Sequence, residues 1–479
     1  MTAKRSNGVL NSAASHAIDY LSRVDDRPVK ATMTSAELRN ALGGPLSKTG
    51  EPAEQVIDRL AAAALTGTVA TAGPRYFGFV VGGAVPAAVG ADWLVSAWDQ
   101  NCGIFALSPI VSVIEEITGG WLKHIAGLRS DASVGFVTGC QMANFTSLAA
   151  ARHHVLREAG WDVEARGLAG APKVTIVTSD ESHYTIFMAL RLLGFGAETA
   201  IRIPTDDQGR MRADELAKAL AGVTGPCIIC AQAGNVNTGG FDPINDIADI
   251  VNQHAGTLEP MNVGASRPWL HVDGAFGLWA AASPTRAHFV NGIARADSVA
   301  SDAHKWLNVP YDCGLVFTNH PEAHRSAMSL AAAYIQATDV ERDPHEFTPE
   351  ESRRGRAVPV YAALRSLGAD GLGEMIERNC RLAARMATNL SKNPRVRILN
   401  DVVLNQVLVR FEADRQDTDQ LTKDVIAGVQ EEGTCWLGGT TWHGLAAMRV
   451  SVSNWSTTDA DIDRSAAAIL KVFAQRSAT

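Results

Sequence analysis

The segment SVASDAHKWLNVPYDCG, residues 298–314, places a histidine, a lysine and a tryptophan side by side. A short apolar run leads into the segment, and Pro310 and Tyr311 signal a turn shortly after the lysine. A lysine that forms an imine with an aldehyde must be held in place, partly desolvated and aimed at its target. A surface lysine needs no such neighbours. Lys305 is therefore the first candidate for covalent chemistry.

A candidate anion site lies in the motif TGCQMAN, residues 138–144. Gly139 allows a tight turn, and the backbone amides of Cys140 and Gln141 would open a helix. A helix N-terminus presents N–H groups and the positive end of the helix dipole, which together suit a dianionic phosphate. A single glycine before a helix also fits an ordinary strand-to-helix turn, so this motif leaves both interpretations open.

Two more polar side chains follow apolar runs. SDESHYT (179–185) places His183 just after one run, and HVDGAFG (271–277) has Asp273 at the end of another. A carboxylate that enters a mostly buried site needs a cationic partner, because uncompensated burial of a charge is costly. A structural salt bridge would meet this need equally well, and a histidine at the start of a helix can simply pack or cap it.

Taken together, these residues match the needs of a pyridine aldehyde that carries a phosphate. Such a group requires an amine for the imine, an anchor for the phosphate and a flat side chain against its ring. It also requires a carboxylate that keeps the ring nitrogen protonated, because the protonated ring stabilises a carbanion. Lys305, the turn at Gly139, His183 and Asp273 can fill these roles.

The elements that must position these residues follow a regular alternation. Short β-branched runs are separated by Ala- and Leu-rich segments of helical length, and the runs cover residues 133–139, 173–179, 227–232, 269–275, 298–304 and 313–319. This alternation is typical of a mostly parallel α/β sheet covered on both faces, in which ligands bind at the carboxyl ends of the strands. We expect helices before residue 70, with a capping box at Thr34–Glu37, and a smaller α+β region towards the C-terminus.

Size, charge and cysteine usage exclude several classes of protein. The 479 residues, 46% of them hydrophobic and 20% charged, predict two or three packed units, and the net charge of −8 indicates neither nucleic acid nor a membrane as a partner. No stretch is typical of a signal peptide or a membrane span, so we expect a cytoplasmic protein. Cys227 and Cys230 form a C-x-x-C, but CIICAQ fits a buried strand better than a zinc or redox site. No metal is expected.

Several motifs resemble those of the pyridoxal-phosphate-dependent group II amino-acid decarboxylases, the relatives of aromatic-L-amino-acid, tyrosine and glutamate decarboxylases. The motifs are HVDGAFG, SDAHKW, TGCQMAN, SDESHYT, PRYFGFVVGGAVPAAVGADWL, GNVNTGGFDPI and SRRGRAVPVYAALRSLG. The resemblance spans residues 70–455 and implies the α/β fold of the fold-type-I transferases that use pyridoxal phosphate, including aspartate aminotransferase. It implies pyridoxal 5'-phosphate as the cofactor and a homodimer with the active site at the subunit interface.

The same resemblance implies how the chain divides into domains. An N-terminal helical segment would cover residues 1–70. A large cofactor-binding α/β domain with a mainly parallel seven-stranded sheet would cover residues 71–365. A small C-terminal α+β domain would cover residues 366–479.

A role for each motif residue also follows from the resemblance. Lys305 would be the Schiff-base lysine, His183 would stack on the cofactor ring, and Asp273 would pair with the ring nitrogen. Further cofactor contacts would come from Gly139, Cys140, Gln141, Asn235, Ala275 and His304. Arg449 corresponds to the strand arginine that contacts the substrate carboxylate in glutamate-specific members, although an edge-strand arginine also suits a local ion pair or solvent.

Two departures from the family pattern matter. Where many members read Asn-Pro-His-Lys, this chain has Asp302 at the first position, and because a carboxylate repels phosphate we expect Asp302 to point away or to pair with a base. The loop that carries a proton-donating tyrosine in many members reads YIQATDVERDPHEFTPEE here, and Tyr334 does not fall at the position of that tyrosine. His345 is a candidate acid, because histidine titrates near neutral pH. A solvated loop histidine is the alternative.

We therefore predict a carboxy-lyase that converts an L-amino acid to its amine and carbon dioxide. The small apolar segment 80–84, which includes Val81, and the nearby Trp98 and Phe105 favour an apolar or aromatic substrate. The unusual loop leaves open oxidative decarboxylation to an aldehyde and retro-aldol cleavage of a β-hydroxy amino acid. A catalytically silent partner subunit that binds the cofactor is a third alternative, and the complete set of ring-contacting residues argues against it.

Overall fold

The computed structural model describes residues 3–257, 267–329, 341–414 and 417–478, which divide into two compact units. Unit 1 comprises residues 1–81, 384–398 and 408–479, and unit 2 comprises residues 82–383 and 399–407. The domain boundaries expected after residues 70 and 365 stay a prediction. We describe each unit by itself.

Unit 2 is built on a seven-stranded sheet. Its strands are β1 (Ser133–Val137), β2 (Thr175–Ser179), β3 (Ile201–Ile203), β4 (Cys227–Gln232), β5 (Trp269–Asp273), β6 (Ser298–Asp302) and β7 (Gly314–Thr318). The strand order is β1-β7-β6-β5-β4-β2-β3, and β7 alone runs antiparallel to its two neighbours. The prediction of a mainly parallel seven-stranded sheet is confirmed.

The strands form where the sequence has short runs that are apolar on both faces. All six residues of β4, CIICAQ, are buried, as a strand in the middle of a parallel sheet requires. Cys227 and Cys230 therefore lie inside the sheet, and burial raises the pKa of the Cys227 thiol to about 12. Their interpretation as part of a buried strand is confirmed.

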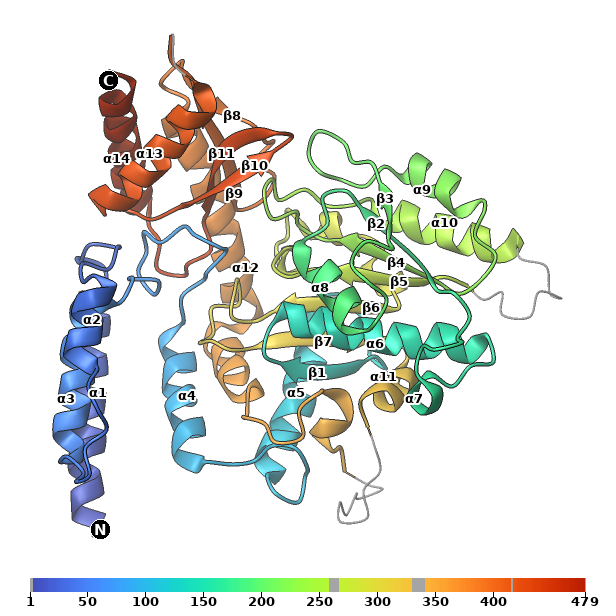
Figure 1. Cartoon of the computed structure of the whole chain (residues 1–479), viewed down its shortest axis with the longest axis horizontal. Helices are drawn as coiled ribbons and strands as arrows, with labels where there is room; N and C mark the ends of the chain where they lie inside the picture. The colour runs from blue at the N-terminus through green and yellow to red at the C-terminus, as the bar shows by residue number, and fades with distance from the viewer. Residues whose placement is uncertain (1–2, 258–266, 330–340, 415–416, 479) are drawn as a thin grey trace. The chain divides into compact units, whose positions relative to one another are not determined.

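Helices pack against this sheet, and α6 lies across β5, β6 and β7 (Figure 1). The α-helices of unit 2 are α4 (Pro86–Trp98), α5 (Pro109–Ile125), α6 (Cys140–Glu158), α7 (Val163–Arg166), α8 (Tyr184–Leu192), α9 (Ala213–Leu220), α10 (Ile244–Thr257) and α11 (Pro321–Met328). Four short 3-10 helices are η1 (Gly277–Ala282), η2 (Ala287–Val290), η3 (Ile293–Arg295) and η4 (Pro344–Phe347). The core between α6, α8 and the sheet includes Leu148, Ile186, Ile228 and Trp269, all of them buried.

Unit 1 combines helices from both ends of the chain with a smaller sheet. The N-terminal helices are α1 (Ala3–Arg23), α2 (Ser35–Leu42) and α3 (Ala53–Gly67), and Thr34 and Glu37 form the predicted capping box of α2. The second sheet has the order β10-β11-β9-β8, from β8 (Val396–Ile398), β9 (Gln406–Phe411), β10 (Gly438–Trp442) and β11 (Leu445–Ser451). Its helices are α13 (Thr418–Glu432) and α14 (Asp459–Ser477).

The long helix α12 (Ala357–Leu390) carries the chain from unit 2 into unit 1. It is interrupted at Gly368, whose φ of 68° lies in the left-handed region that glycine adopts without strain. Among the described residues, no helix is both long enough and apolar enough to cross a lipid bilayer.

Candidate active site

Three of the predicted site residues, Cys140, Asp273 and Lys305, lie at one edge of the seven-stranded sheet. Asp273 ends β5, and the parallel strand β6 ends at Asp302, three residues before Lys305. β1 also runs parallel to β6, because β7 between them is antiparallel to both. The start of α6 after β1 therefore meets the same edge, as the carboxyl ends of parallel strands do in ligand-binding α/β sheets.

One small cavity at this edge brings four of the predicted residues together. Its lining consists of His183, Gln232, Gly234, Val236, Asp273, Ala275, Phe276 and Lys305. His183 is the residue just before α8 and lines the cavity from there. Because Gly234 has no side chain, Gly277 can approach it closely. The cavity therefore holds an amine, a carboxylate and an imidazole against apolar walls.

Lys305 is partly buried, and its Nζ lies 2.9 Å from Oδ2 of Asp302. Burial acts to lower the pKa of the Lys305 amine, but the neighbouring Asp302 carboxylate outweighs burial and raises that pKa above its ordinary value. His304 lies on the other side of the same carboxylate, with Nε2 3.4 Å from Asp302 Oδ1. Its Nδ1 accepts the backbone N–H of Cys313, and its ring stacks on Tyr311.

Asp302 does not point away from the site. Its side chain is buried, and Oδ1 accepts the backbone N–H of Cys140 at 2.7 Å, at the start of α6. Of the two arrangements expected for Asp302, the structure shows the pairing with a base, which is Lys305. A buried carboxylate needs hydrogen-bond donors. Asp302 uses the backbone N–H of Cys140, which was predicted to bind a phosphate.

Asp273 is held by three donors. Oδ1 accepts the backbone N–H of Ala275 at 3.1 Å and the thiol of Cys140 at 3.4 Å, and Oδ2 accepts Nδ2 of Asn144 at 3.0 Å. Burial, followed by the charge of Asp273, raises the pKa of the Cys140 thiol well above its ordinary value. Cys140 therefore stays protonated and donates to the carboxylate.

Sequence reasoning missed the residues that support this site. Asn144, Thr185 and His271 are buried and hydrogen-bonded to each other or to Asp273 and His183. A signal for His271 exists in the sequence, because residues two apart in a strand share a face and His271 precedes Asp273 by two. The contact of Asn144 depends on how α6 packs on the sheet, which the motif alone does not reveal.

Three predicted cofactor residues have other surroundings. Gln141 is exposed on α6, while Gly139 lies so close to His304 that a Cβ would come within 3.2 Å of its ring. The side chain of Asn235 faces its own loop: Oδ1 accepts the backbone N–H groups of Asn237 and Thr238, and Nδ2 donates to the carbonyl of Glu181. Contact of Asn235 with the cofactor stays a prediction.

The candidate acid His345 is buried in η4, where its backbone N–H donates to the carbonyl of Gly103 and its ring lies 3.6 Å from Glu351. Phe105, a predicted substrate residue, is half-buried, and its N–H donates to Asp343 at 2.7 Å. Tyr334 lies outside the described residues.

Two predicted substrate residues belong to unit 1. Val81 packs there among buried apolar residues, namely Val24, Val29, Ala70 and Tyr76. Arg449 is half-buried on β11 opposite Gly438, and burial lowers the pKa of its guanidinium. Their contact with a substrate stays a prediction.

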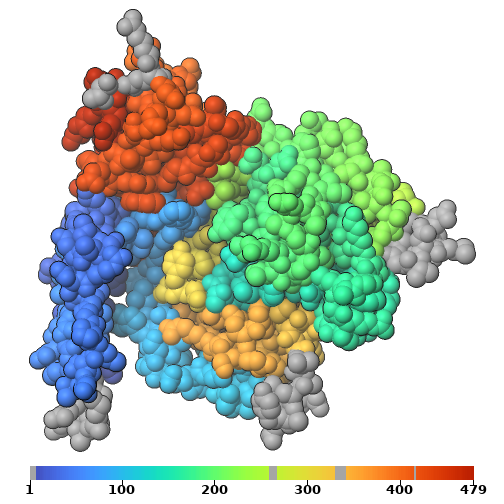
Figure 2. Space-filling model, viewed as in Figure 1, coloured from blue at the N-terminus to red at the C-terminus, as the bar shows by residue number. Residues whose placement is uncertain are grey.

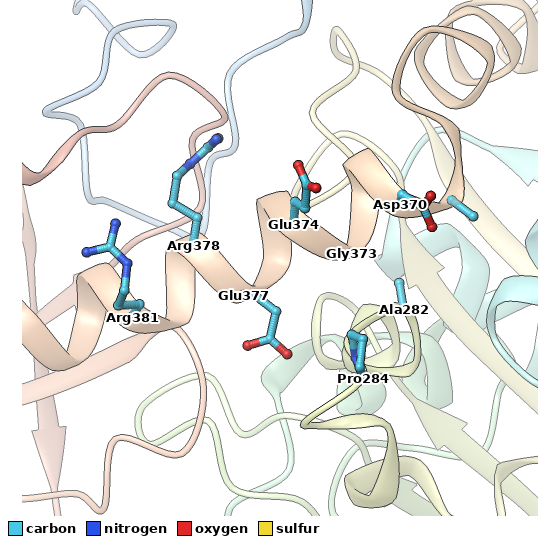
Figure 3. A pocket seen from close by; sticks show the side chains of 9 residues that line it. Ala282, Pro284, Asp370, Gly373, Glu374, Glu377, Arg378 and Arg381 are labelled. Atoms are coloured by element: carbon cyan, nitrogen blue, oxygen red, sulfur yellow. The ribbon is translucent and has the colours of Figure 1, made fainter.

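A larger hollow of about 590 Å³ lies elsewhere on unit 2, along α12 (Figure 3). Glu377 points there towards Pro284, while Arg378 and Arg381 point to the other side of the helix (Figure 3). Burial opposes ionisation of Glu377, but hydrogen bonds from Ser283 and Thr285 lower its pKa to about 2. This hollow contains none of the predicted site residues, so size alone would point to the wrong place.

Comparison with known proteins decides the family. The model of the pyridoxal-dependent decarboxylase conserved domain matches residues 37–412. The chain belongs to this family. It is accordingly an enzyme that depends on pyridoxal phosphate and removes carbon dioxide from an amino acid, as its motifs predicted.

Relatives and solved structures agree with this placement. The decarboxylase is 28% identical over 454 residues to the aromatic-L-amino-acid decarboxylase of Bacillus atrophaeus, covering 92% of this chain and 90% of that protein. It is 27% identical over 372 residues to the human acidic amino acid decarboxylase GADL1. This match covers 76% of the present chain and 68% of the human protein. A crystal structure of Oryza sativa TDC with PLP and tryptamine superposes with a TM-score of 0.89 at 22% identity over 99% of both chains, which shows the shared fold, fold type I.

The residues of this decarboxylase fit its cofactor. The N-terminus of α6 faces the site, and a Cβ at Gly314 would come within 2.4 Å of the Gly139 carbonyl carbon, so two glycines keep that turn close to β7. Lys305 supplies the amine and Asp273 a carboxylate held by fixed donors. Asp302 departs from this fit, because its carboxylate and a phosphate cannot both accept the N–H of Cys140.

Proposed function

We propose that this decarboxylase converts an aromatic or apolar L-amino acid to its amine. The cavity beside Lys305 supports this substrate class, since Val236, Ala275 and Phe276 form its apolar wall. Lys305 is assigned to the cofactor, and none of the other described lining residues is a lysine or an arginine that could pair with an acidic side chain.

A second observation concerns the apolar segment that starts at Gly82. A Cβ on Gly82 would lie 1.8 Å from the carbonyl oxygen of Lys305, so the backbone of this segment runs directly against the lysine. The N–H of Val85 donates to the carbonyl of Asn308 and holds the segment there. A relative that matches 92% of this chain is named an aromatic-L-amino-acid decarboxylase.

The proposed roles follow from the geometry of the cavity. Lys305 would hold the cofactor through its amine. Asp273 would accept a hydrogen bond from the protonated ring nitrogen, and His183 would lie against the ring. When bound, pyridoxal phosphate supplies a ring that withdraws electrons from the bonds of the substrate α-carbon.

The chain's own residues then decide which bond of the α-carbon breaks. An apolar wall offers the substrate carboxylate no cation, so the charged group is poorly solvated there and its loss as carbon dioxide relieves that cost. A tight arginine clamp would retain the carboxylate instead. His183, and the predicted acid His345, would govern the return of a proton to the α-carbon.

Product analysis tests the proposal. The purified enzyme, loaded with pyridoxal phosphate, is offered L-tryptophan, L-tyrosine, L-phenylalanine, L-glutamate and L-aspartate in separate reactions. Equal amounts of carbon dioxide and amine from the aromatic substrates are expected. Turnover confined to glutamate or aspartate would overturn the substrate class. Aldehyde with ammonia and peroxide would identify the oxidative reaction, and glycine with an aldehyde would identify aldol cleavage.

Replacing the lysine tests the covalent role. Lys305→Ala is expected to abolish turnover and the visible absorption of lysine-bound cofactor, because no other amine lines the described cavity. Borohydride followed by mass spectrometry should then find no cofactor attached to the chain. A borohydride-stable adduct in Lys305→Ala would contradict the assignment of this residue.

We also infer that the enzyme is a homodimer. Unit 2 exposes an apolar stripe on α5, formed by Ile110, Val113 and Ile117 at helical spacing. In unit 1, the N-terminal helices, blue in Figure 2, expose Leu10, Ile18, Leu21, Leu60 and Leu65. Exposed apolar faces of this kind are typical of subunit interfaces.

The dimer is tested by light scattering on the eluted protein. The native chain is expected at twice 50.9 kDa, and Val113→Asp should shift it towards a single chain, because a charge would then be buried at the interface. Glu116→Lys, on the same helix, is the matched control for a change of charge. A native chain that elutes as a monomer at micromolar concentration would refute the proposal.

A further inference from the structure

A continuous chain of hydrogen bonds crosses the interior of unit 2 and ends at Asp273. The bonds join Trp269 Nε1 to Ser298 Oγ (2.9 Å), Ser298 Oγ to His271 Nδ1 (2.9 Å), His271 Nε2 to Asn144 Oδ1 (2.9 Å) and Asn144 Nδ2 to Asp273 Oδ2 (3.0 Å). The first four side chains are at most 1% exposed. At such depth each polar group must find its partner within the protein.

The chemistry of the two ends sets the direction of every bond. The indole N–H of Trp269 can only donate, so the Ser298 hydroxyl accepts from it and donates its own hydrogen to Nδ1 of His271. At the other end the carboxylate of Asp273 can only accept, so Asn144 turns its NH₂ group towards Asp273. The Asn144 oxygen then faces His271, which must donate from Nε2.

We call this chain of hydrogen bonds from Trp269 to Asp273 the relay. It requires a neutral His271 with its proton on Nε2. Burial lowers the pKa of His271 to about 4, which keeps the ring neutral near pH 7. The direction of the hydrogen bonds therefore does not change with pH in that range.

A branch connects the same amide to His183. The second N–H of Asn144 points to Thr185 Oγ1 at 3.3 Å, and Thr185 Oγ1 lies 2.8 Å from Nδ1 of His183. Thr185 accepts from Asn144, and we assign its hydroxyl hydrogen to Nδ1 of His183. In this arrangement His183 accepts at Nδ1, and its own ring proton belongs on Nε2.

We propose that His271 is a positioning residue that, together with the carboxylate of Asp273, holds the amide of Asn144 in one orientation and thereby fixes both the hydrogen bond to Asp273 and the proton position of His183. The proposal rests on the roles that Proposed function assigns to Asp273 and His183. If the amide turned over, its oxygen would face the Asp273 carboxylate, which repels it. Thr185 would then donate to that oxygen, and His183 would have to carry its proton on Nδ1.

The test compares two substitutions of His271. His271→Leu removes both hydrogen-bonding groups, whereas His271→Gln keeps a donor and an acceptor at similar distances. Leu270→Val, whose side chain points to the opposite face of β5 from Trp269 and His271, is the control for loss of core stability. Cofactor binding, kcat, KM and the pH titration of the visible absorption are measured for all three.

His271→Leu is expected to lower kcat by about tenfold or more, as loss of a supporting hydrogen bond commonly does, with KM little changed. It should also shift the midpoint of the absorption titration, because the proton of the ring nitrogen is less well held. His271→Gln should restore both properties, and Leu270→Val should change neither. If His271→Leu and His271→Gln are equally impaired, or if His271→Leu matches Leu270→Val, the positioning role is wrong.

A second measurement does not need the cofactor. In protein labelled with ring-¹⁵N histidine, solid-state NMR distinguishes Nε2–H from Nδ1–H, and the signal missing in His183→Asn identifies His183. The native chain should show Nε2–H at His183, and His271→Leu should show a population of Nδ1–H. An unchanged His183 signal would overturn the proposal. If His271→Leu does not fold, Ser298→Ala replaces it and is expected to give a smaller population of Nδ1–H at His183. No Nδ1–H signal in Ser298→Ala would contradict the proposal.

Failure of the relay is distinguishable from failure of the assigned site. Asp273→Asn removes the carboxylate itself and is expected to abolish most turnover. If Asp273→Asn remains fully active, the role of Asp273 is wrong, whatever His271 does. If Asp273→Asn is inactive while His271→Leu is normal, the site stands and only the relay is refuted.

Discussion

Three donors converge on the carboxylate of Asp302: the amine of Lys305, the backbone amide of Cys140 and, at a longer distance, the ring of His304. A phosphate at the start of α6 would need the same amide and would meet the same negative charge. A phosphate bound there would have to displace or neutralise this carboxylate.

Asp302→Asn is expected to tighten cofactor binding by about tenfold, because it removes a negative charge from the phosphate side while its amide oxygen can still accept from Cys140. Loss of the charge also lowers the pKa of Lys305, which favours the reactive neutral amine. Titration of cofactor-free protein with pyridoxal phosphate measures the affinity. Asp312→Asn, which alters a carboxylate paired with Arg356, controls for net charge. Affinity that is unchanged or weaker in Asp302→Asn would contradict this prediction.

The main chemical residues could be found from the sequence because each follows a strand. Lys305, Asp273 and His183 are visible in this way, and the structure has all three around one cavity. Asn144 and Thr185 could not be found, because their contacts arise only when two helices pack on the sheet. The orientation of the Asp302 side chain depends on the hydrogen-bond donors around it in the fold. The motif does not contain that information.

At the scale of elements, the turn between β1 and α6 is held against β7 by two glycines. A Cβ at Gly314 would meet backbone atoms of Gly139 at 2.4 to 2.7 Å, which no side-chain movement can relieve. The turn and the strand must separate if Gly314 gains a side chain.

Gly314→Ala is expected to lower the free energy of unfolding by about 1–3 kcal/mol through overpacking. It should also weaken cofactor binding, because the amide of Cys140 moves with the turn. Urea denaturation and cofactor titration measure the two effects. Gly120→Ala, in a helix where an added Cβ meets nothing within 4 Å, should instead stabilise the protein by up to about 1 kcal/mol. Equal stability of Gly314→Ala and the native chain would show that the turn can yield.

Most elements of the sheet could be predicted because their residues are apolar on both faces. The six predicted runs contain β1, β2, β4, β5, β6 and β7. β3 was missed, since it has three residues and two of them are exposed, which leaves too little pattern to recognise. The order of the strands could not be predicted either, because it depends on side-chain packing between segments far apart in the chain.

At the scale of the whole molecule, buried histidines make stability depend on pH. Burial lowers the pKa of His271 to about 4 and that of His324 to about 3, whereas in the unfolded chain a histidine titrates near 6.5. As the pH falls from 6.5 towards 4, the unfolded chain gains protons that the folded protein does not take up. Stability present above pH 6.5 is therefore lost, by about 1.4 kcal/mol per pH unit for each histidine. Asp242 acts in the opposite direction, because burial raises its pKa to about 7.

His324→Gln is expected to reduce the acid sensitivity of unfolding by the equivalent of one proton between pH 6.5 and 4.5, because the unfolded chain then has one histidine fewer to protonate. Urea denaturation at half-unit steps of pH measures the slope of stability. His124→Gln alters an exposed histidine and should leave the slope unchanged. Parallel curves for native protein and His324→Gln would show that His324 is protonated in the folded state.

The position of β7 between β1 and β6 also determines when the site can form during synthesis. β1 is an edge strand whose only neighbour among the described strands of the sheet is β7. Ser133 therefore cannot pair until its register partner, Thr318, has been synthesised. The bond from the Cys140 amide to Asp302 joins residues 162 positions apart. At about 5–20 residues per second, a ribosome takes roughly 8–32 s to cover that distance. Throughout this interval β1 of the nascent chain has no strand partner, and the contact between Cys140 and Asp302 cannot form until Asp302 has been synthesised.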